Sequence, residues 1–423
     1  MTLSQPPVVN QRQRVLLAAL VAATGSIPLP VNLNSIALIF LVFACMIQQP
    51  WSELKKKLSV PSLWMIPAIY FLWMCCSYFW DVTGGFAVRD IERYAMLFFI
   101  PPALAVVPRM PQKFLKITGA VFIGVTIGVC IGCIVKSYNE YQANHDYRVF
   151  FYHYLSQQMG LNAIFLSNYC LSGMIWLLYY GFVQQERRKP LTYVFLIAAG
   201  MFLFAMVLLL SSKLVIILTL LSLLLFILYI GYLRKRFIRA VIVIVLFIAA
   251  GFISVRNLGY VKWRFSVTSV KQYAGPQDNN NGLSLRILMW QTAWNLIKQR
   301  PFLGYGVKGS RVKVIEKYKE ENFVIGYTEG YHSHNQYLQS ALMGGLPAFL
   351  LLIAMLLKFG WEGIRKNNVL LLLLLFHFMC QSVIESAFEV QQELVFYMLF
   401  LFLFYYHPPG LPTPSREGIA YAV

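Results

Sequence analysis

Two histidines one residue apart stand at the end of the only long polar stretch of this chain, in the tetrapeptide His332-Ser333-His334-Asn335. An unperturbed imidazole is mostly neutral at pH 7 and can accept a proton from a hydroxyl group. A run of arginines and lysines precedes the two histidines, and such cations bind phosphate oxygens. The combination suggests a base beside a bound anion. Because the surrounding segments are apolar, the expected chemistry is on a lipid-linked phosphate.

The rest of the chain has the composition of a membrane protein. Of its 423 residues, 58% are hydrophobic and 13% are charged, whereas about a quarter of an ordinary soluble domain is charged. Uninterrupted runs of leucine, isoleucine and valine exclude the alternating pattern of a membrane β-barrel. A spanning helix needs roughly 20 apolar residues. The sequence therefore predicts an all-α polytopic membrane protein of about twelve transmembrane helices, at residues 15–28, 33–48, 62–80, 94–108, 114–135, 160–183, 191–210, 214–232, 240–256, 338–357, 369–385 and 390–406.

The basic residues predict the orientation of these spans, because short cytoplasmic loops collect lysine and arginine. Threading twelve spans in order places one set of basic runs on the same side, including Lys55-Lys56-Lys57, Arg187-Arg188-Lys189 and Arg234-Lys235-Arg236. Both termini are then cytoplasmic, and the connections 81–93 and 136–159 lie outside. The predicted organisation is spans one to nine in 1–256, a long periplasmic loop with amphipathic helices in 257–337, spans ten to twelve in 338–406, and a cytoplasmic tail in 407–423.

The net charge of +19 would suggest nucleic acid as a partner of a soluble protein. Here the cytoplasmic loops account for most of the charge, so no nucleic-acid partner is expected. They do not account for the long loop, where basic residues outnumber acidic ones. An outer surface with that surplus attracts anions such as diphosphates or acidic glycans. The basic residues of the loop are Lys262, Arg264, Lys271, Arg286, Lys298, Arg300, Lys308, Arg311, Lys313, Lys317 and Lys319.

Within the long loop, apolar residues recur with helical spacing over 285–297, and Ser284 is the candidate N-cap. We expect this amphipathic helix to lie on the membrane or to dip into it, and to end near Pro301. The Gly-Tyr-Gly sequence that follows predicts a tight turn whose backbone amides approach a ligand or a neighbouring segment. Gly304 and Gly306 are therefore candidate substrate-binding positions.

Four segments together match a known pattern. They are Ser284-Leu285-Arg286 leading into Pro301-Phe302-Leu303-Gly304-Tyr305-Gly306, His334-Asn335 followed after nine residues by Gly345, Ser211-Ser212-Lys213 between two spans, and Glu385-Ser386 with Glu389 near the outer end of the penultimate helix. With these segments the chain resembles the O-antigen ligase and polymerase superfamily of bacterial inner-membrane glycosyltransferases, over about 190–400. Two positions depart from the family pattern. Lys213 stands where relatives carry arginine, and it offers a point charge in place of a planar two-pronged donor. The second departure is minor: after Gly345 the sequence continues Leu346-Pro347-Ala348, so the small residue expected at the fourth position is an alanine.

The resemblance implies a multi-pass enzyme of the bacterial inner membrane, with its active site on the periplasmic side. The donor would be a glycan linked through diphosphate to undecaprenol. The acceptor would be a sugar hydroxyl, as on lipid A-core, and the lipid diphosphate would leave. Direct attack by the hydroxyl would invert the anomeric carbon. No cofactor or metal is expected, since the outer motifs contain no Asp-x-Asp to hold a divalent ion.

The resemblance also implies roles for individual residues. His334 is the candidate general base, and Arg286 with Lys213 would grip the diphosphate and stabilise its charge as it leaves. Asn335 would hold the acceptor or the imidazole, and His332 would assist or bind sugar. Each also has a structural interpretation, because a loop histidine is usually a surface residue and long basic side chains often reach from a helix to lipid headgroups.

Two more pairs of charged residues are candidates for binding substrate. Arg89 and Arg93 would guide the anionic headgroup, or they belong to an internally paired, solvated turn. Glu385 and Glu389 are expected one helical turn apart at a membrane edge, where carboxylates are costly. We expect them to pair with an arginine of the long loop rather than to act as acids.

Ligation of a finished lipid-linked polymer to lipid A-core is the first functional hypothesis. The same residues would serve a polymerase that extends a lipid-linked chain, or an enzyme that transfers glycan to protein hydroxyls. The alternative from another class is a polysaccharide transporter or flippase. Such proteins usually gather ionisable residues at the membrane midplane and have related halves. Here the charge lies in one asymmetric loop and no internal repeat is found, which favours the enzyme.

Overall fold

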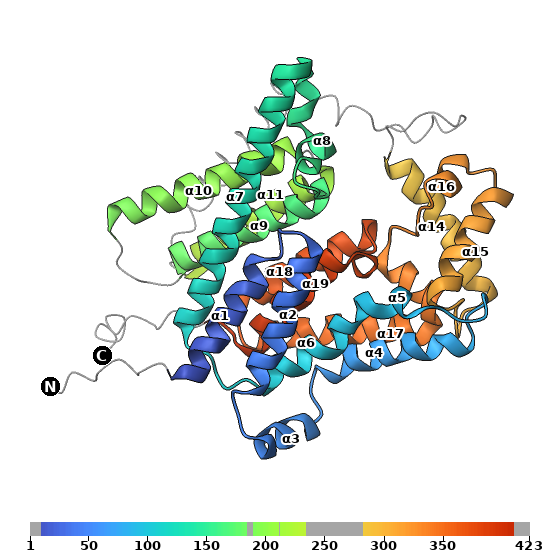
Figure 1. Cartoon of the computed structure of the whole chain (residues 1–423), viewed down its shortest axis with the longest axis horizontal. Coiled ribbons are helices and arrows are strands. Elements are labelled where there is room, and N and C mark those ends of the chain that lie inside the picture. Colours follow the sequence, from blue (N-terminus) through green and yellow to red (C-terminus); the bar gives the residue numbers. More distant parts are fainter. Residues whose placement is uncertain (1–9, 184–188, 211, 234–281, 410–423) are drawn as a thin grey trace. The chain divides into compact units, whose positions relative to one another are not determined.

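The computed structural model describes residues 10–183, 189–210, 212–233 and 282–409, and within these ranges all regular structure is helical (Figure 1). Every predicted span except one coincides with a helix. The exception, 240–256, lies outside the described residues, as does the first part of the long loop. The predicted all-α class is therefore confirmed.

Four of the described helices are long and apolar enough to cross a membrane. They are α7 (Gln112–Asn144), α9 (Ala163–Leu178, continued by a π-helical turn, Tyr179–Val183), α10 (Pro190–Leu209) and α17 (Gln336–Arg365). A fifth span would join α2 (Val31–Met46) to α3 (Trp51–Ser59), although these two helices are bent by 102°. Shorter apolar helices cover Met65–Phe79, Lys213–Tyr229 and Val369–Ile384. The helices are thus those of a membrane protein, and the total of twelve spans stays a prediction.

The chain divides into two compact units, of which the first comprises Met1–Met110, Trp263–Trp361 and Leu374–Tyr406. Its helix α19 is buried along its whole length from Glu393 to Tyr405, as expected of a helix that is apolar on every side. Another helix of this unit, α6, packs against α2, α4 and α19. The remaining bounds are α1 (Gln11–Gly25), α4 (Met65–Cys76), η1 (Ser77–Phe79), α5 (Val88–Ile91), η2 (Glu92–Tyr94), α6 (Ala95–Val106), α18 (Val369–Ile384, of which 374–384 belongs to this unit), η6 (Ala387–Glu389) and α19 (Gln391–Tyr406).

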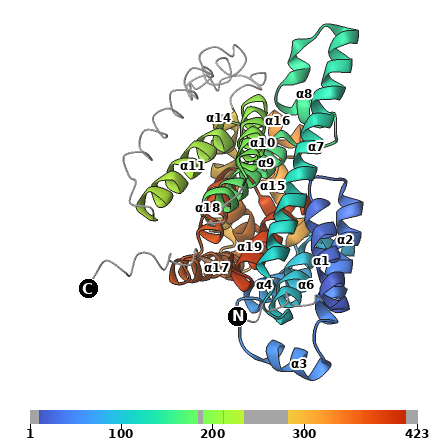
Figure 2. The ribbon, with the colours of Figure 1, turned by 90° about the vertical axis from the view of Figure 1, so that its left-hand side faces the viewer.

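Helices α1 and α2 form a hairpin at the start of this unit, drawn in dark blue in Figures 1 and 2. Asn34 fastens the turn between them, because its side-chain amide donates to the carbonyl of Ala23 at 3.2 Å and to the hydroxyl of Ser26 at 3.0 Å. Asn34 is 3% exposed, so these bonds satisfy a buried polar group.

The second unit comprises Pro111–Lys262, Glu362–Leu373 and His407–Val423. Its helix α9 packs against α7, α10 and α11 (Lys213–Leu233). Two short helices, η3 (Tyr147–Phe150) and α8 (Tyr152–Gln157), fold back beside the end of α7. Helix α7 continues to Asn144, well past the end predicted for this span, so the first part of the predicted 136–159 connection is helical.

The described part of the long loop belongs to the first unit and forms α14 (Gly282–Gln299), α15 (Val307–Glu320) and α16 (Val324–Thr328). Helix α14 begins two residues before Ser284, so Ser284 lies inside the first turn and is not the N-cap. The apolar face of α14 was expected on the membrane. Instead it is buried inside the protein, where Met289 and Ala293 pack in one cluster with Tyr318, Phe323 and Leu342.

Helix α17 is broken at Gly345, whose φ of 65° and ψ of −159° are not helical. The break leaves carbonyl groups without their usual partners, since Pro347 has no N–H for Met343. The turn after α14 supplies the missing donors. The amides of Tyr305 and Gly306 donate to the carbonyls of Leu342 (2.7 Å) and Met343 (3.0 Å), and the amide of Leu346 donates to the carbonyl of Pro301 (2.8 Å). We call this backbone pairing of 301–306 with 342–346 the splint.

Asp81 holds the other side of the same turn. Its Oδ2 accepts the amides of Lys308 (3.1 Å) and Gly309 (3.0 Å), which are first-turn donors of α15. Gly306, at the N-cap position of α15, has no side chain to do this. The carboxylate therefore caps α15 from a distant part of the sequence, and its negative charge suits the N-terminus of a helix.

Candidate active site

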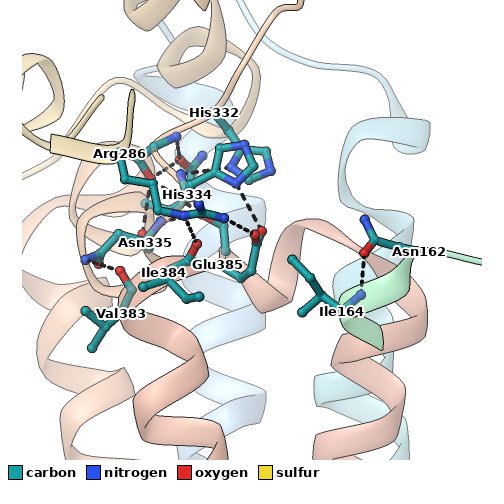
Figure 3. Close-up of polar contacts among 12 residues, drawn as sticks. Asn162, Ile164, Arg286, His332, His334, Asn335, Val383, Ile384 and Glu385 are labelled. Carbon is teal, nitrogen blue, oxygen red and sulfur yellow. Dashed lines mark hydrogen bonds and ion pairs between the residues drawn. The ribbon is translucent and has the colours of Figure 1, made fainter. Parts of the chain in front are cut away.

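The centre of the candidate active site is Glu385, which follows the last residue of α18. Its Oε1 accepts a hydrogen bond from Arg286 Nη2 at 2.8 Å, and its Oε2 lies 3.0 Å from His334 Nδ1 (Figure 3). Arg286 Nε also donates to the carbonyl of Ile384 at 2.9 Å. The partners lie 99 and 51 residues from Glu385 in sequence, and all belong to the first unit. The structure thus brings the predicted base and the predicted cation together on one carboxylate.

The Glu385 carboxyl group is ionised at neutral pH. Burial raises its pKa, but the neighbouring His334 and Arg286 outweigh burial and lower the pKa to about 2. An ionised carboxylate has no hydrogen to donate, so the hydrogen of the contact with His334 lies on Nδ1. In the neutral ring, Nε2 then keeps its lone pair, as a general base requires.

The two histidines form a tight turn in front of α17. His334 has a φ of 44°, in the left-handed region that few residues with a Cβ adopt. Its backbone amide donates to Nδ1 of His332 at 3.0 Å, which closes the turn. The two rings stack with their centroids 4.1 Å apart, and Figure 3 shows both above the Glu385 carboxylate. The His-x-His spacing therefore has a structural cause, since the first imidazole fixes the backbone of the second residue.

Asn335 belongs to the framework that positions this turn. Its side-chain Nδ2 donates to the carbonyl of Val383 at 3.0 Å, and its Oδ1 accepts the amide of Leu338 at 3.0 Å, capping α17. Its backbone amide donates to Ser386 Oγ at 3.1 Å. Asn335 is 8% exposed. It therefore ties the start of α17 to the end of α18, and its side-chain bonds run to the backbone rather than to the imidazole.

Glu389 pairs with a different arginine. Its Oε2 lies 2.8 Å from Arg93 Nη2, and the Tyr94 hydroxyl donates to its Oε1. The expected pairing with an arginine of the long loop is thus right for Glu385 and wrong for Glu389. The two carboxylates are not one helical turn apart either, because α18 ends at Ile384 before η6 begins. Arg93 consequently does not belong to an internally paired turn.

The remaining predicted residues lie elsewhere. Arg89 is exposed in α5. Gly304 and Gly306 have φ values of 67° and 85° and belong to the turn of the splint. The backbone amides of this turn were expected to approach a ligand or a neighbouring segment. In the structure they bond to a neighbouring segment, 342–343 of α17. Lys213 is the first residue of α11, in the second unit, and its phosphate-binding role stays a prediction.

The position of Glu385 between His334 and Arg286 was not predicted from the sequence. The sequence did contain an indication of this position. A carboxylate at a membrane edge is unfavourable in free energy unless basic or hydrogen-bonding side chains pair with it. The hydrogen bond from the His334 amide to His332 Nδ1 was not predicted either, although an imidazole can accept the backbone N–H of the residue two positions later.

Fold and site define a helical membrane protein in which one buried carboxylate joins a histidine to an arginine. Residues 198–353 match the family model for O-antigen ligase. This match confirms the resemblance to the O-antigen ligase superfamily that the sequence motifs indicated. The matched range includes Lys213, Arg286 and His334, whereas Glu385 lies beyond it.

The chain is also similar to an uncharacterised protein of Haemophilus influenzae, with 24% identity over 367 residues that cover 83% of each of the two chains. The family match supports a membrane enzyme of the glycosyltransferase kind, which uses a lipid-linked glycan and a glycan acceptor.

Proposed function

We propose that this protein is an inverting glycosyltransferase of the bacterial inner membrane, with its active site on the periplasmic side. It moves a glycan from undecaprenyl diphosphate to a hydroxyl group, and its acceptor is lipid A-core. One observation carries this proposal, namely that Glu385 binds both His334 and Arg286. That arrangement puts a base and a fixed cation within one cluster, as displacement of a diphosphate by a hydroxyl requires.

The base is His334. The acceptor hydroxyl gives its proton to Nε2 as its oxygen attacks the anomeric carbon of the glycan. Glu385 holds the opposite nitrogen, Nδ1, and stabilises the positive charge that the ring gains. Proton transfer by such a positioned group contributes about 10²–10⁴-fold to the rate. Attack from the face opposite the leaving group inverts the anomeric configuration.

The cation is Arg286. As the new bond forms, the bond between the anomeric carbon and the diphosphate oxygen breaks, and the oxygen keeps the electron pair. The guanidinium group is oriented by its bonds to Glu385 and to the carbonyl of Ile384, and its side chain is 21% exposed. A cation held in a fixed position costs little reorganisation when charge develops on the leaving oxygen. Lys213 is proposed as a second cation for the diphosphate, and the mechanism needs no metal ion.

The experiment is transfer by the purified full-length protein in detergent or vesicles. It receives undecaprenyl-diphosphate-linked glycan and lipid A-core, and the products are separated by size. One discrete addition to lipid A-core supports the ligase. A ladder on undecaprenol would show a polymerase, and addition to protein would show an O-oligosaccharyltransferase. The absence of any new glycosidic bond, with glycan moved across the vesicle membrane, would leave a transporter.

We expect His334→Ala and Arg286→Ala each to lower the rate of transfer by about 10²–10⁴-fold. Lys313→Ala is the matched control, because Lys313 is a cation of the same loop that forms a surface pair with Glu316. Loss of activity in the control as well would mean that the positive charge of the loop matters in general, and the assigned roles would then be wrong.

A further inference from the structure

The hydrogen bonds of the two stacked imidazoles assign opposite tautomers to them. Nδ1 of His332 accepts the backbone N–H of His334, so it carries no hydrogen, and the neutral ring holds its hydrogen on Nε2. Nδ1 of His334 donates to Glu385, so the neutral ring of His334 has its lone pair on Nε2. One ring therefore offers a donor at Nε2 and the other offers an acceptor.

His332 keeps this donor over the physiological pH range. Burial lowers its pKa to about 3, and the nearby His334, Arg311 and Arg93 act in the same direction, whereas Glu385 opposes them. A ring that stays neutral and has given Nδ1 to a backbone amide cannot act as a base at pH 7. What remains available is the hydrogen on Nε2.

Both Nε2 atoms reach accessible space. Neither has a hydrogen-bond partner within the described ranges, and neither is among the buried polar atoms that lack one. The two rings are half-buried and stack 4.1 Å apart. A molecule that contacts the Nε2 lone pair of His334 therefore lies beside the ring of His332 as well.

We propose that His332 binds the acceptor, by donating its Nε2 hydrogen to a sugar oxygen next to the hydroxyl group that His334 deprotonates. This inference rests on the proposed function. A neutral donor suits a hydroxyl or ring oxygen, whereas the anionic diphosphate has Arg286, on the other oxygen of Glu385. No proton moves to or from His332 in the reaction. The pair of rings thus recognises a polyhydroxylated acceptor, with one ring taking a proton and the other donating a hydrogen bond.

Two substitutions separate the two nitrogens of His332. The amide of His332→Asn falls near the position of Nδ1, so this variant can still accept the N–H of His334 but loses the donor at Nε2. The amide of His332→Gln reaches the position of Nε2, so this variant keeps the outer donor and loses the bond that closes the turn. Both variants are assayed as full-length protein, with lipid A-core and undecaprenyl-diphosphate-linked glycan varied in turn.

We expect His332→Asn to raise the KM for lipid A-core by about 2–10-fold, the value of one neutral hydrogen bond, and to leave the KM for the lipid-linked donor unchanged. His332→Gln should leave the KM for lipid A-core within about 2-fold and should lower kcat instead, because the turn that positions His334 is loosened. An unchanged KM for lipid A-core in His332→Asn, or an increase confined to the lipid-linked donor, would overturn the inference while transfer by the unsubstituted protein stands. If the unsubstituted protein forms no glycosidic bond, the proposed function itself fails.

Discussion

At the scale of single residues, the candidate site depends on the charge of Glu385. Its carboxylate is 11% exposed and takes hydrogen bonds from an arginine and a histidine that come from separate segments. Breaking a buried ion pair by removing one partner typically costs about 3–5 kcal/mol, because the other charge stays buried. Glu385 therefore fixes the tautomer of His334. Its negative charge also offsets the free-energy cost of burying the guanidinium group of Arg286.

Glu385→Gln tests this role without changing the shape of the side chain. The amide oxygen can still accept the Nδ1 hydrogen of His334, but the negative charge is gone. We expect the rate of transfer to fall, by up to about 10²–10⁴-fold, the range that a general base contributes. Glu316→Gln is the control, since Glu316 pairs with Lys313 on the surface. A rate equal to that of the unsubstituted protein would show that the carboxylate does not assist His334.

The dependence of stability on pH, measured by chemical unfolding in detergent, checks the charge of Glu385. A carboxyl group whose pKa is depressed in the folded protein contributes stability above its unfolded value of about 4.3 and loses that contribution as the pH falls through its folded value. For Glu385 the folded value is about 2, so the carboxylate persists through the whole range of an activity assay. The free energy of unfolding of the unsubstituted protein should therefore decline as the pH falls below about 4, and the decline should be smaller in Glu385→Gln, which has no carboxyl group at this position.

The chemistry of the site was predictable from residue types, but the pairing was not. Arg286 and His334 were identified from local motifs, and the structure joins them. That they share Glu385, and that Arg93 takes Glu389, depends on contacts across 51 to 296 residues. Such contacts leave no local pattern in a single sequence.

At the scale of elements, the splint fixes where the catalytic residues lie relative to each other. Arg286 lies on α14, and the turn after α14 is hydrogen-bonded to the broken part of α17, which begins directly after the histidine turn. Gly345 is required at the break for two reasons. Its φ and ψ lie in a region that only glycine occupies readily, and a Cβ there would collide with the carbonyl of Phe302.

Gly345→Ala should therefore destabilise the protein, by about 1–3 kcal/mol from backbone strain alone. Gly360→Ala is the matched control on the same helix, because a Cβ at Gly360 would meet Leu375 at an ordinary 3.6 Å. There, alanine should be neutral or stabilise by roughly 0.4–1 kcal/mol. Thermal unfolding in detergent measures both. Equal stability of the two variants would mean that the break does not need glycine.

Hydropathy predicted where the helices lie more reliably than it predicted what each helix packs against. Each described span lies where an apolar run predicted it, because a run of about 20 apolar residues has few alternatives to a helix. The apolar face of α14 was harder to interpret, since periodicity identifies a buried face but not what covers it. Here Tyr318 of α15 and Leu342 of α17 cover it.

At the scale of the whole molecule, the side of the membrane that the candidate site faces determines which substrates can reach it. The basic runs predict that Lys56 is cytoplasmic and that Lys319 of α15 is periplasmic. Lys56→Cys and Lys319→Cys, each in a Cys76→Ser background because Cys76 is exposed, allow a direct test. A membrane-impermeant maleimide should label the cysteine at 319 in intact spheroplasts, and the one at 56 only after lysis. The reverse pattern would place the site on the cytoplasmic side and exclude lipid A-core as its acceptor.

The composition alone predicted a membrane protein, and the positions of the basic residues predicted its orientation in the membrane. Neither could give the length of α7 or the bend between α2 and α3, since both depend on packing rather than on hydropathy. The number of spans likewise depends on where each helix meets the bilayer, which a run of apolar residues bounds only to within a few positions.

The splint also limits how such enzymes can be recombined. Because 301–306 and 342–346 are joined by backbone hydrogen bonds, a chimera has to take both segments from the same parent. A chimera with a crossover at 337 would take the turn 301–306 from one parent and the broken part of α17, 342–346, from the other. The backbone hydrogen bonds between these two segments would then not be matched. Swapping specificity between homologues therefore requires a downstream junction beyond Leu346.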